Sequence, residues 1–400
     1  MTTFSVRFLG CKVSYSDGEE IRERLLADGH EEMRPGEAEI AFVNTCCVTR
    51  EAVGKSRQAV AKAARTHDRV YVTGCGANLE GAFAGMAENV IVLAQGKTAA
   101  PERVAEMLGP GHPVDRSPKP KRVRAFVQIQ DGCSFRCSYC VVPLVRGPGR
   151  SKSAEVVLAD IRRRVEQGHK EVVLSGINLG CFRDSKAGVS LAGLVREAGR
   201  TSGLERLRLS SIEINHVSPE LVAAIRETPT ACRHLHVPLQ SGDDGILRAM
   251  RRRYDAATFL RRLEGLGDFN LTSDVIAGFP GEDEAAFQRT LDLVERAEIT
   301  KVHVFPYSPR PGTATESEDD VPVGVKKERA ARLRESSKNA CLRRWRGKIG
   351  VVESILIDRP GRGYASDYTP WLLDGPLGEL LQARAKKVTE QGIIGIARRS

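Results

Sequence analysis

Short apolar runs alternate with helical segments along the first hundred residues. Four runs have the length and β-branched content of strands: FSVRFLG (4–10), IAFVNT (40–45), VYVTG (70–74) and NVIVLA (89–94). We expect helices between them over residues 16–29, 49–66 and 97–108, the first capped by Ser16 or Asp17. Strands separated by helices pair in parallel through right-handed crossovers. The pattern therefore predicts a small doubly wound parallel sheet.

After a stretch rich in proline, glycine and charge, the strand–helix unit repeats about six times. The expected strands cover residues 123–130, 171–176, 204–211, 234–239, 273–279 and 301–307. Six units in roughly 185 residues are too few for a closed eight-fold barrel, which takes about 250 residues. We therefore predict a partial (β/α)6 barrel that is open on one side.

The last fifty residues lose the strand–helix rhythm and predict short strands and turns, although LLQARAKKV also fits a helix. The fold class is thus α/β with a small all-β module at the C-terminus. We assign residues 1–110 to an N-terminal domain, 111–122 to a linker, 123–345 to the barrel and 346–400 to the last module.

Composition narrows the class of protein. The 400 residues are 41% hydrophobic and 28% charged, which is typical of a globular protein. No apolar run is long enough to span a membrane, and the N-terminus does not resemble a signal peptide. We therefore expect a cytoplasmic protein in which cysteines serve metal or redox chemistry instead of disulfides.

Positive charge is concentrated in one segment. The net charge is +10, and residues 326–348 hold ten basic and two acidic residues. This segment, with Arg343 and Arg344, suits a polyanion such as RNA, as does the run Arg251, Arg252 and Arg253. A solvated helix face explains either cluster equally well.

Three of the ten cysteines form a CxxxCxxC directly after the first barrel strand: Cys133, Cys137 and Cys140. Three thiolates this close can hold three corners of an iron–sulfur cube and leave the fourth iron open. A structural zinc site usually takes four ligands, often as two CxxC pairs. The spacing favours the cluster.

Three further cysteines are far apart in sequence, but each follows a predicted strand. Cys11, Cys46 and Cys75 come after the strands that end near residues 10, 45 and 74. Parallel strands end at one edge of a sheet, so the three thiols should meet there. We predict a second three-thiolate cluster, with Cys46 preferred over its neighbour Cys47. Taken singly, each cysteine is more typical of a small core residue.

At CSFRCSYC the sequence resembles the radical S-adenosylmethionine superfamily. The resemblance covers nearly the whole chain: GCKVS, NTC and TGC, then SGINLG, LRLSSIE, HLHVPLQSG, MRRRY, DVIAGFPGE and FPYSPRPGT, are similar to the methylthiotransferases of that superfamily. The last fifty residues resemble the family's small RNA-binding, TRAM-like β-domain in position only. The resemblance implies two [4Fe–4S] clusters, S-adenosylmethionine and a tRNA partner, with an electron donor such as flavodoxin or ferredoxin.

The family has three branches, which act on isopentenyladenosine in tRNA, on N6-threonylcarbamoyladenosine in tRNA, or on an aspartate of a ribosomal protein. GCKVS, the RRRY run and FPYSPRPGT most resemble the threonylcarbamoyl branch, which often has NTCTVT where this chain has NTCCVT. The expected product is 2-methylthio-N6-threonylcarbamoyladenosine beside the anticodon, at position 37. An iron–sulfur, redox-sensing RNA-binding protein is the alternative from another class.

The resemblance also implies a division of labour. The cluster on Cys133, Cys137 and Cys140 would cleave S-adenosylmethionine to a 5′-deoxyadenosyl radical, which abstracts the hydrogen at C2 of the adenine. The cluster on Cys11, Cys46 and Cys75 would deliver the sulfur. Four residues are candidates to contact S-adenosylmethionine: Tyr139, Gly176, Glu213 and Gly278. Each is equally typical of loop packing, a turn or a surface carboxylate.

Overall fold

The computed structural model describes residues 2–94, 106–109 and 122–398, and the chain divides into two compact units. The first unit combines Met1–Lys119 with two later segments, Asp131–Arg150 and Ser308–Ser317. The second contains Pro120–Gln130, Ser151–Tyr307 and Glu318–Ser400. In the part of the chain so described, no helix has the length and apolar character needed to cross a membrane.

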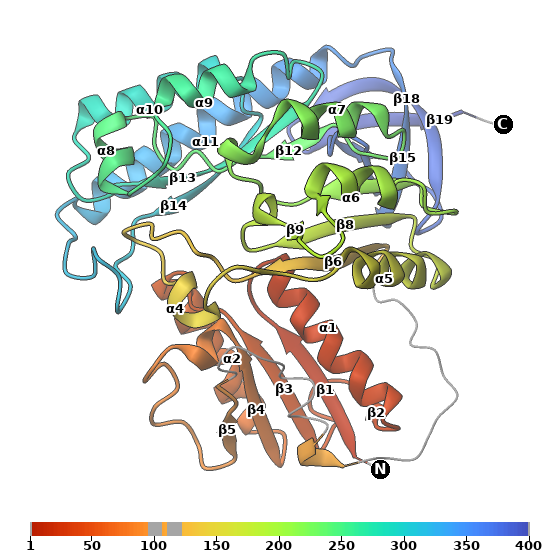
Figure 1. The fold of residues 1–400 in the computed structure, drawn as a ribbon, viewed down its shortest axis with the longest axis vertical. Coiled ribbons are helices and arrows are strands. Elements are labelled where there is room, and N and C mark those ends of the chain that lie inside the picture. The colour runs from red at the N-terminus through yellow and green to blue at the C-terminus, as the bar shows by residue number, and fades with distance from the viewer. Residues whose placement is uncertain (1, 95–105, 110–121, 399–400) are drawn as a thin grey trace. The chain divides into compact units, whose positions relative to one another are not determined.

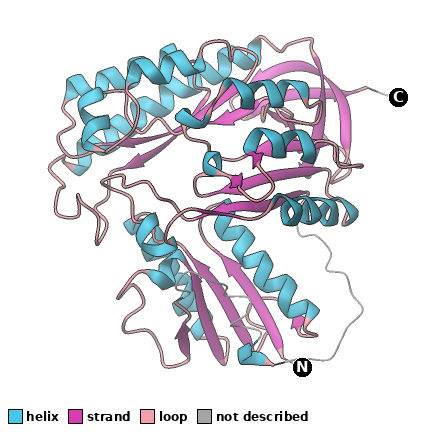
Figure 2. Ribbon diagram, in the orientation of Figure 1, coloured by secondary structure: helices cyan, strands magenta, loops and turns pink. Residues whose placement is uncertain are grey.

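The first unit is built on a parallel sheet (Figures 1 and 2). Its elements are β1 (Thr3–Phe8), α1 (Lys12–Ala27), β2 (Glu31–Glu32), β3 (Ile40–Thr45), α2 (Arg50–Ala64), β4 (Arg69–Gly74), the 3-10 helix η1 (Cys75–Asn78), β5 (Val90–Val92) and α4 (Val142–Arg146). The strands lie in the order β2-β1-β3-β4-β5, all parallel.

Apolar side chains alternate along these strands and bury both faces of the sheet. Phe4, Phe42 and Tyr71 pack with Ile21 and Leu25 of α1. The alternate side chains of β3 and β4 point to the other face of the sheet, where they pack with Ala59 and Val60 of α2. The sheet is therefore doubly wound, as the sequence predicts.

The first helix begins earlier than we expected. It starts at Lys12, with Cys11 at the cap position, and not at Ser16 or Asp17. The first buried residues of this helix are Val13, Ser14 and Ser16, and the small polar side chains of the two serines hide the helical pattern. Ser14 donates to the carbonyl of Leu9, and Asn44 donates to the carbonyl of Ser14, so α1 lies close to the sheet. Cys11 thus stands at a helix N-terminus.

The second unit has two parts. The elements of its first part are β6 (Arg124–Asp131), β7 (Arg150–Ser151), α5 (Ala154–Glu166), β8 (Glu171–Gly176), η2 (Leu179–Cys181), β9 (Arg183–Asp184), β10 (Val189–Ser190), α6 (Leu191–Ala198), β11 (Arg206–Leu209), η3 (Ile214–His216), α7 (Pro219–Glu227), β12 (His234–His236), α8 (Asp244–Ala249), α9 (Ala256–Leu263), β13 (Asn270–Ala277), α10 (Glu284–Arg296), β14 (Lys301–Pro306) and α11 (Val323–Arg346).

Six parallel strands of this part form one open, curved wall. Hydrogen-bonded pairing joins β6, β8 and β11, and separately β12, β13 and β14. Parallel bridges from Leu207 to Ala231 and from Ser211 to His236 connect the two sets. The predicted partial (β/α)6 barrel is confirmed.

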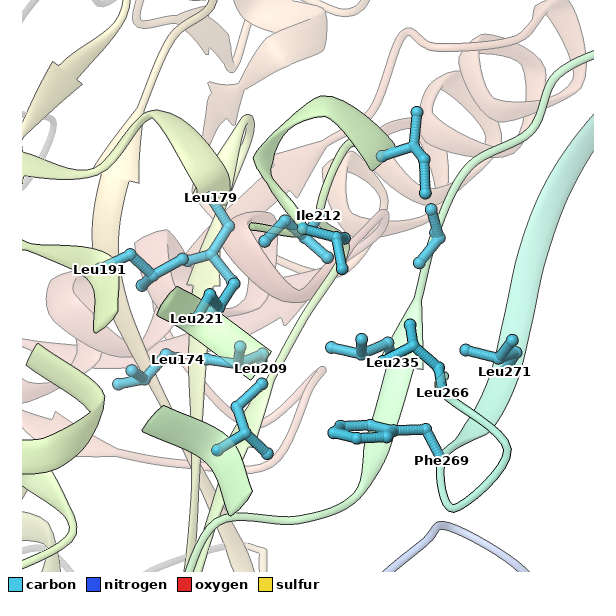
Figure 3. Packing of buried hydrophobic residues seen from close by; sticks show 14 of the residues in the cluster. Leu174, Leu179, Leu191, Leu209, Ile212, Leu221, Leu235, Leu266, Phe269 and Leu271 are labelled. Atoms are coloured by element: carbon cyan, nitrogen blue, oxygen red, sulfur yellow. The ribbon is translucent and has the colours of Figure 1, made fainter. Parts of the chain in front are cut away.

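A large apolar core fills the space between this wall and its helices. Leu174 and Leu209 come from the strands, Leu191 and Leu221 from helices α6 and α7, and all are buried together (Figure 3). Leu235, Leu266, Phe269 and Leu271 extend the same core toward the second set of strands, as the labelled side chains in Figure 3 show. This core holds the ends of the strands in fixed positions.

The C-terminal module is a closed barrel in the order β15-β16-β17-β19-β18. Its strands are β15 (Val352–Arg359), β16 (Arg362–Ala365), β17 (Pro370–Leu372), β18 (Leu380–Thr389) and β19 (Gly392–Ala397). LLQARAKKV is therefore a strand and not a helix. Trp371, fully buried, packs inside with Ile355, Ile357 and Ile393. The predicted all-β module is confirmed.

Two expectations concern residues outside the described ranges. The helix expected over residues 97–108 lies mostly there, and so does most of the linker over 111–122. The domain boundaries that we drew from the sequence stay a prediction, since the two units group the chain differently from those boundaries.

Candidate functional site

The first unit brings Cys11, Cys46 and Cys75 to one edge of its sheet. They follow β1, β3 and β4, which are neighbours in the sheet. A Cβ added at Gly10 would stand 3.2 Å from the Cβ of Cys46, so the first two loops touch. Burial raises the pKa of Cys75 to about 12, and the nearby Cys11 thiol adds to this rise. Burial and the nearby Cys11 thiol also raise the pKa of Cys46.

Cys46 and Cys47 have different surroundings. Cys46 is half-buried, and its backbone exchanges two 3.1 Å hydrogen bonds with the hydroxyl of Ser56 on α2. Cys47 is fully buried in an apolar cluster with Cys75, Val141 and Val145. Burial raises the pKa of the Cys47 thiol, and the neighbouring Cys75 adds to this. Cys46 directly follows β3, as Cys75 directly follows β4, so Cys46 remains our prediction.

Arg146 connects this edge to the CxxxCxxC segment. Its Nε donates to the Sγ of Cys75 at 2.9 Å, and its terminal nitrogens pair with Asp17 and Asp131. Burial lowers the pKa of Arg146, but the Cys75 thiol and the two carboxylates outweigh burial and raise it. The guanidinium therefore stays charged beside Cys75.

The CxxxCxxC segment is a closed loop in the first unit. Gly132 has φ +66°, and a Cβ there would lie 2.2 Å from the carbonyl oxygen of Pro148, so only glycine fits. The backbone N–H of Cys133 donates to Gly147 at 3.0 Å, which closes the base of the loop. The N–H of Phe135 points at the Sγ of Cys133 at 3.4 Å, and Cys133, Cys137 and Cys140 are all half-buried.

Each of the two sets supplies three cysteines, and thiolates are the ligands of iron–sulfur clusters. No group of three or more His, Cys, Asp and Glu side chains in the described ranges is placed to hold one metal ion. A [4Fe–4S] cube binds each thiolate at a different iron, so its ligands stand farther apart. Burial disfavours the Cys75 thiolate, the Arg146 guanidinium offsets part of this, and bound iron would stabilise the thiolate further. The residues present therefore fit the clusters.

The second unit places three of the predicted S-adenosylmethionine contacts at or just beyond the ends of parallel strands. Gly176 ends β8, and a Cβ there would meet the side chain of Gln130 at 3.1 Å. Gly278 follows β13 with φ +73°, and its N–H donates to Glu282 at 2.8 Å. Glu213 follows β11 and is ion-paired with Arg252 at 3.1 Å. Tyr139, in the first unit, is half-buried in the cysteine loop.

Ion pairs neutralise much of the basic helix α11. Lys326 and Arg329 are buried against Asp319 and Glu282, and Arg344 faces Asp367 at 3.6 Å. The exposed cations of this helix that have no ion pair to a described residue are Lys327, Arg334, Arg343 and Arg346. Of the other basic run, Arg251 and Arg253 are exposed. The positive surface is therefore smaller than the sequence count suggests.

Sequence reasoning missed three charged residues that surround the cysteines: Asp17, Asp131 and Arg146. Hydrophobic periodicity gives no signal for a buried ion pair, and Asp17 looked like a helix cap. Asp131 immediately precedes the cysteine loop and Arg146 closes α4, so their nearness to Cys133 and Cys140 in the chain was the available signal.

Comparison with known proteins is consistent with this geometry. Residues 127–294 match the model of the radical SAM superfamily, and residues 3–94 match that of the uncharacterized protein family UPF0004. The threonylcarbamoyladenosine tRNA methylthiotransferase MtaB of Thermotoga maritima is 34% identical, over 98% of this chain and 96% of that protein. The chain belongs to the radical SAM tRNA methylthiotransferase family.

The other relatives in this family are named for one or the other of two activities. MtaB of Bacillus subtilis is 34% identical over 98% of this chain and 87% of that protein. The tRNA-2-methylthio-N(6)-dimethylallyladenosine synthase of Solibacter usitatus is 33% identical over 91% of this chain and 87% of its own. Family membership confirms the predicted cofactors, [4Fe–4S] clusters and S-adenosylmethionine.

Among solved structures, the radical S-adenosylmethionine methyltransferase TsrM from Kitasatospora setae has a similar fold. Its TM-score is 0.58 at 16% identity, over 79% of this chain and 77% of that chain. At this identity the likeness concerns the fold alone.

Proposed function

We propose that this methylthiotransferase inserts a methylthio group at C2 of N6-threonylcarbamoyladenosine, at position 37 of tRNA. The assignment of the substrate rests on the near full-length similarity to MtaB of Thermotoga maritima and of Bacillus subtilis. The motifs GCKVS, RRRY and FPYSPRPGT support the same branch. Relatives named as dimethylallyladenosine synthases are almost as similar, which makes isopentenyladenosine the second candidate.

Each set of cysteines has its own role in this proposal. Cys133, Cys137 and Cys140 would hold the cluster that binds S-adenosylmethionine, and Cys11, Cys46 and Cys75 would hold the auxiliary cluster that handles sulfur. When bound, these groups supply one-electron cleavage of S-adenosylmethionine and a methylated sulfur for transfer. An adenine C–H has no useful acid–base route at neutral pH, so the chain needs no catalytic His–Asp pair.

The protein's own residues would bind and orient the reacting groups and would exclude water. Gly132 lets the cysteine loop close on Pro148, and Arg146 holds Cys75 beside Asp131. Gly176, Glu213, Gly278 and Tyr139 would contact S-adenosylmethionine. Glu213 is held by Arg252, so this arginine has a positioning role before any contact with RNA.

The proposed RNA surface consists of exposed cations. Arg251, Arg253 and Arg343 are exposed, whereas Arg252 and Arg344 are partly engaged with carboxylates. Phosphate contacts give sequence-independent affinity that falls with salt. The site of action would be the cytoplasm, with a flavodoxin or ferredoxin as the electron donor.

The test is mass spectrometry of nucleosides from tRNA treated with reconstituted enzyme, reductant and S-adenosylmethionine. We expect N6-threonylcarbamoyladenosine to be converted to its 2-methylthio form. Conversion of isopentenyladenosine alone would leave the family intact and contradict the substrate. If tRNA is unchanged while a ribosomal protein gains the group, the protein-modifying branch is correct.

A further inference from the structure

The strands β12, β13 and β14 of the second unit have one apolar face and one polar face. They pair in parallel and lie side by side (Figure 1). Leu235, Leu271 and Val302 belong to the apolar core beneath the helices. Successive side chains of a strand point to opposite faces, so the residues between these three point away from the helices, to the inner face of the open barrel. Histidine, threonine and aspartate gather on that face, which suits a polar ligand.

Four of these inner side chains form one hydrogen-bonded chain. The Nε2 of His234 and the Nδ1 of His236 lie 3.1 and 2.9 Å from the hydroxyl oxygen of Thr272. The Nε2 of His236 lies 3.1 Å from Oδ1 of Asp274. Because an ionised carboxylate only accepts, His236 donates to it. The Asp274 side chain is 24% exposed, and a carboxylate offers about four acceptor sites, so it can also accept from a ligand.

An exposed histidine and an exposed phenylalanine flank this carboxylate. His303 of β14 is the register partner of Asp274, and its ring lies 5.5 Å from that of His236, edge to face. Phe305, two residues further along the same face, is 42% exposed and lies near the strand ends, where β13 leads to Gly278. Residues two apart in a strand are separated by about 7 Å. The inner face therefore has an aromatic layer at the strand ends and a polar layer about 7 Å deeper.

We propose that this face binds the modified adenine, an inference that rests on the proposed function. Phe305 stacks on the base, because every base offers a flat face to an aromatic ring. The threonylcarbamoyl group on N6 carries a urea, a hydroxyl and a carboxylate, and it reaches the polar layer. Asp274 accepts from its N–H and O–H groups, and His303 donates to its carboxylate. His236 is a positioning residue, since it holds Asp274.

The same layer rejects the other candidate substrate of this family. The isopentenyl group is a hydrocarbon with no hydrogen-bonding atom. On binding, it would remove water from Asp274 and His303 and give no hydrogen bond in return. A site built to hydrogen-bond its ligand discriminates strongly against an analogue without those groups. Asp274 and His303 are therefore specificity-determining residues for the N6 substituent.

The test measures the binding of anticodon stem-loop RNAs to the full-length protein with both clusters reconstituted. Three RNAs differ only at position 37, which carries adenosine, N6-threonylcarbamoyladenosine or isopentenyladenosine. Phosphate contacts are common to all three, so the ratio of two dissociation constants isolates the contribution of the N6 group. We expect wild-type protein to bind the threonylcarbamoyl RNA at least about tenfold more tightly than the adenosine RNA.

Two variants remove the proposed contacts and nearly conserve the shape of the site. Asp274→Asn keeps one acceptor for His236 but loses the acceptors that face the ligand. His303→Phe keeps an aromatic ring but loses its donor. Each should lower the preference for the threonylcarbamoyl RNA at least about fivefold and leave binding of the adenosine RNA unchanged. His303→Phe should also bind the isopentenyl RNA more tightly than wild type, because an apolar ring replaces a polar one.

Lys301→Leu is the matched control. Lys301 is exposed on the same face of β14, but it lies two residues beyond His303 and four residues from Phe305. That spacing is about 13 Å along the strand, which a threonylcarbamoyl group on a base at Phe305 is too short to span. Its preference should stay within about twofold of wild type, since solvent screens exposed charges. An equal fall in Lys301→Leu overturns the proposal.

The outcomes also separate this inference from the proposed function. Wild-type protein that binds the isopentenyl RNA most tightly contradicts the proposed substrate. Wild-type protein that prefers the threonylcarbamoyl RNA, and keeps this preference in both variants, contradicts only the inference. If Asp274→Asn does not retain iron, the exposed His303 decides alone, and an unchanged preference in His303→Phe overturns the proposal.

Discussion

The two sets of cysteines in the first unit are brought together in different ways. Cys133, Cys137 and Cys140 are held within one short loop, closed by Gly132 and by the hydrogen bond from Cys133 to Gly147. Cys11, Cys46 and Cys75 meet only because β1, β3 and β4 are neighbours in a parallel sheet. The first set depends on local backbone geometry, and the second depends on the whole sheet. Substitutions should therefore affect the two sets separately.

Removing one ligand from each set should give the largest effects. Cys137→Ser should abolish both S-adenosylmethionine cleavage and methylthiolation, since in the proposed function its cluster generates the radical. Cys75→Ser should abolish methylthiolation but leave cleavage, because only the auxiliary cluster is lost. Release of 5′-deoxyadenosine and mass spectrometry of tRNA nucleosides measure the two activities. Loss of cleavage in both variants would mean that the sets are not separate.

The neighbouring thiols Cys46 and Cys47 provide a sharper test of the dispersed set. Two clusters hold about eight irons per chain, so loss of one should leave about four. We expect this loss in Cys46→Ala and not in Cys47→Ala, because Cys46 directly follows β3 and neighbouring side chains in extended backbone diverge. Iron and sulfide analysis decides between them. The reverse result would make Cys47 the ligand.

Breaking the link between the two sets should mainly reduce stability. Arg146→Met leaves the half-buried carboxylate of Asp17 without its partner and Asp131 with Arg150 alone, and since breaking a fully buried pair typically costs about 3–5 kcal/mol, we expect a loss of up to that size. Chemical denaturation of the apo-protein measures this loss. Arg150→Met is the control, since its side chain also pairs with Asp131 but is half-exposed. An equal loss in both variants would show that burial is not the cause.

The smallest effect should come from a single neutral hydrogen bond between the same two segments. Asn78 of η1 donates to the carbonyl of Val145 on α4 at 2.9 Å. Asn78→Ala should lower the free energy of unfolding by about 1 kcal/mol. Iron content should be unchanged, because α4 keeps its apolar contacts with Cys75. A loss of iron would show that this bond positions a ligand loop.

Pattern reasoning worked where one kind of residue repeats at a fixed spacing. The strands of both units appear as apolar runs because each is buried on one or both faces, and that pattern is local. The start of α1 was missed because Ser14 and Ser16 occupy buried positions. A small polar side chain fits where a helix lies close to a sheet, but it carries no hydrophobic signal.

The sequence by itself determined the order of strands and helices, the cysteine loop and the membership of the family. These features depend on the spacing of residues along the chain, which can be read directly from the sequence. Only the tertiary structure showed that Arg146 reaches Cys75, Asp17 and Asp131. Burial and ion pairing depend on residues more than a hundred positions apart, such as Asp17 and Arg146. No local pattern specifies such a pair, because its energy exists only once the sheet has assembled.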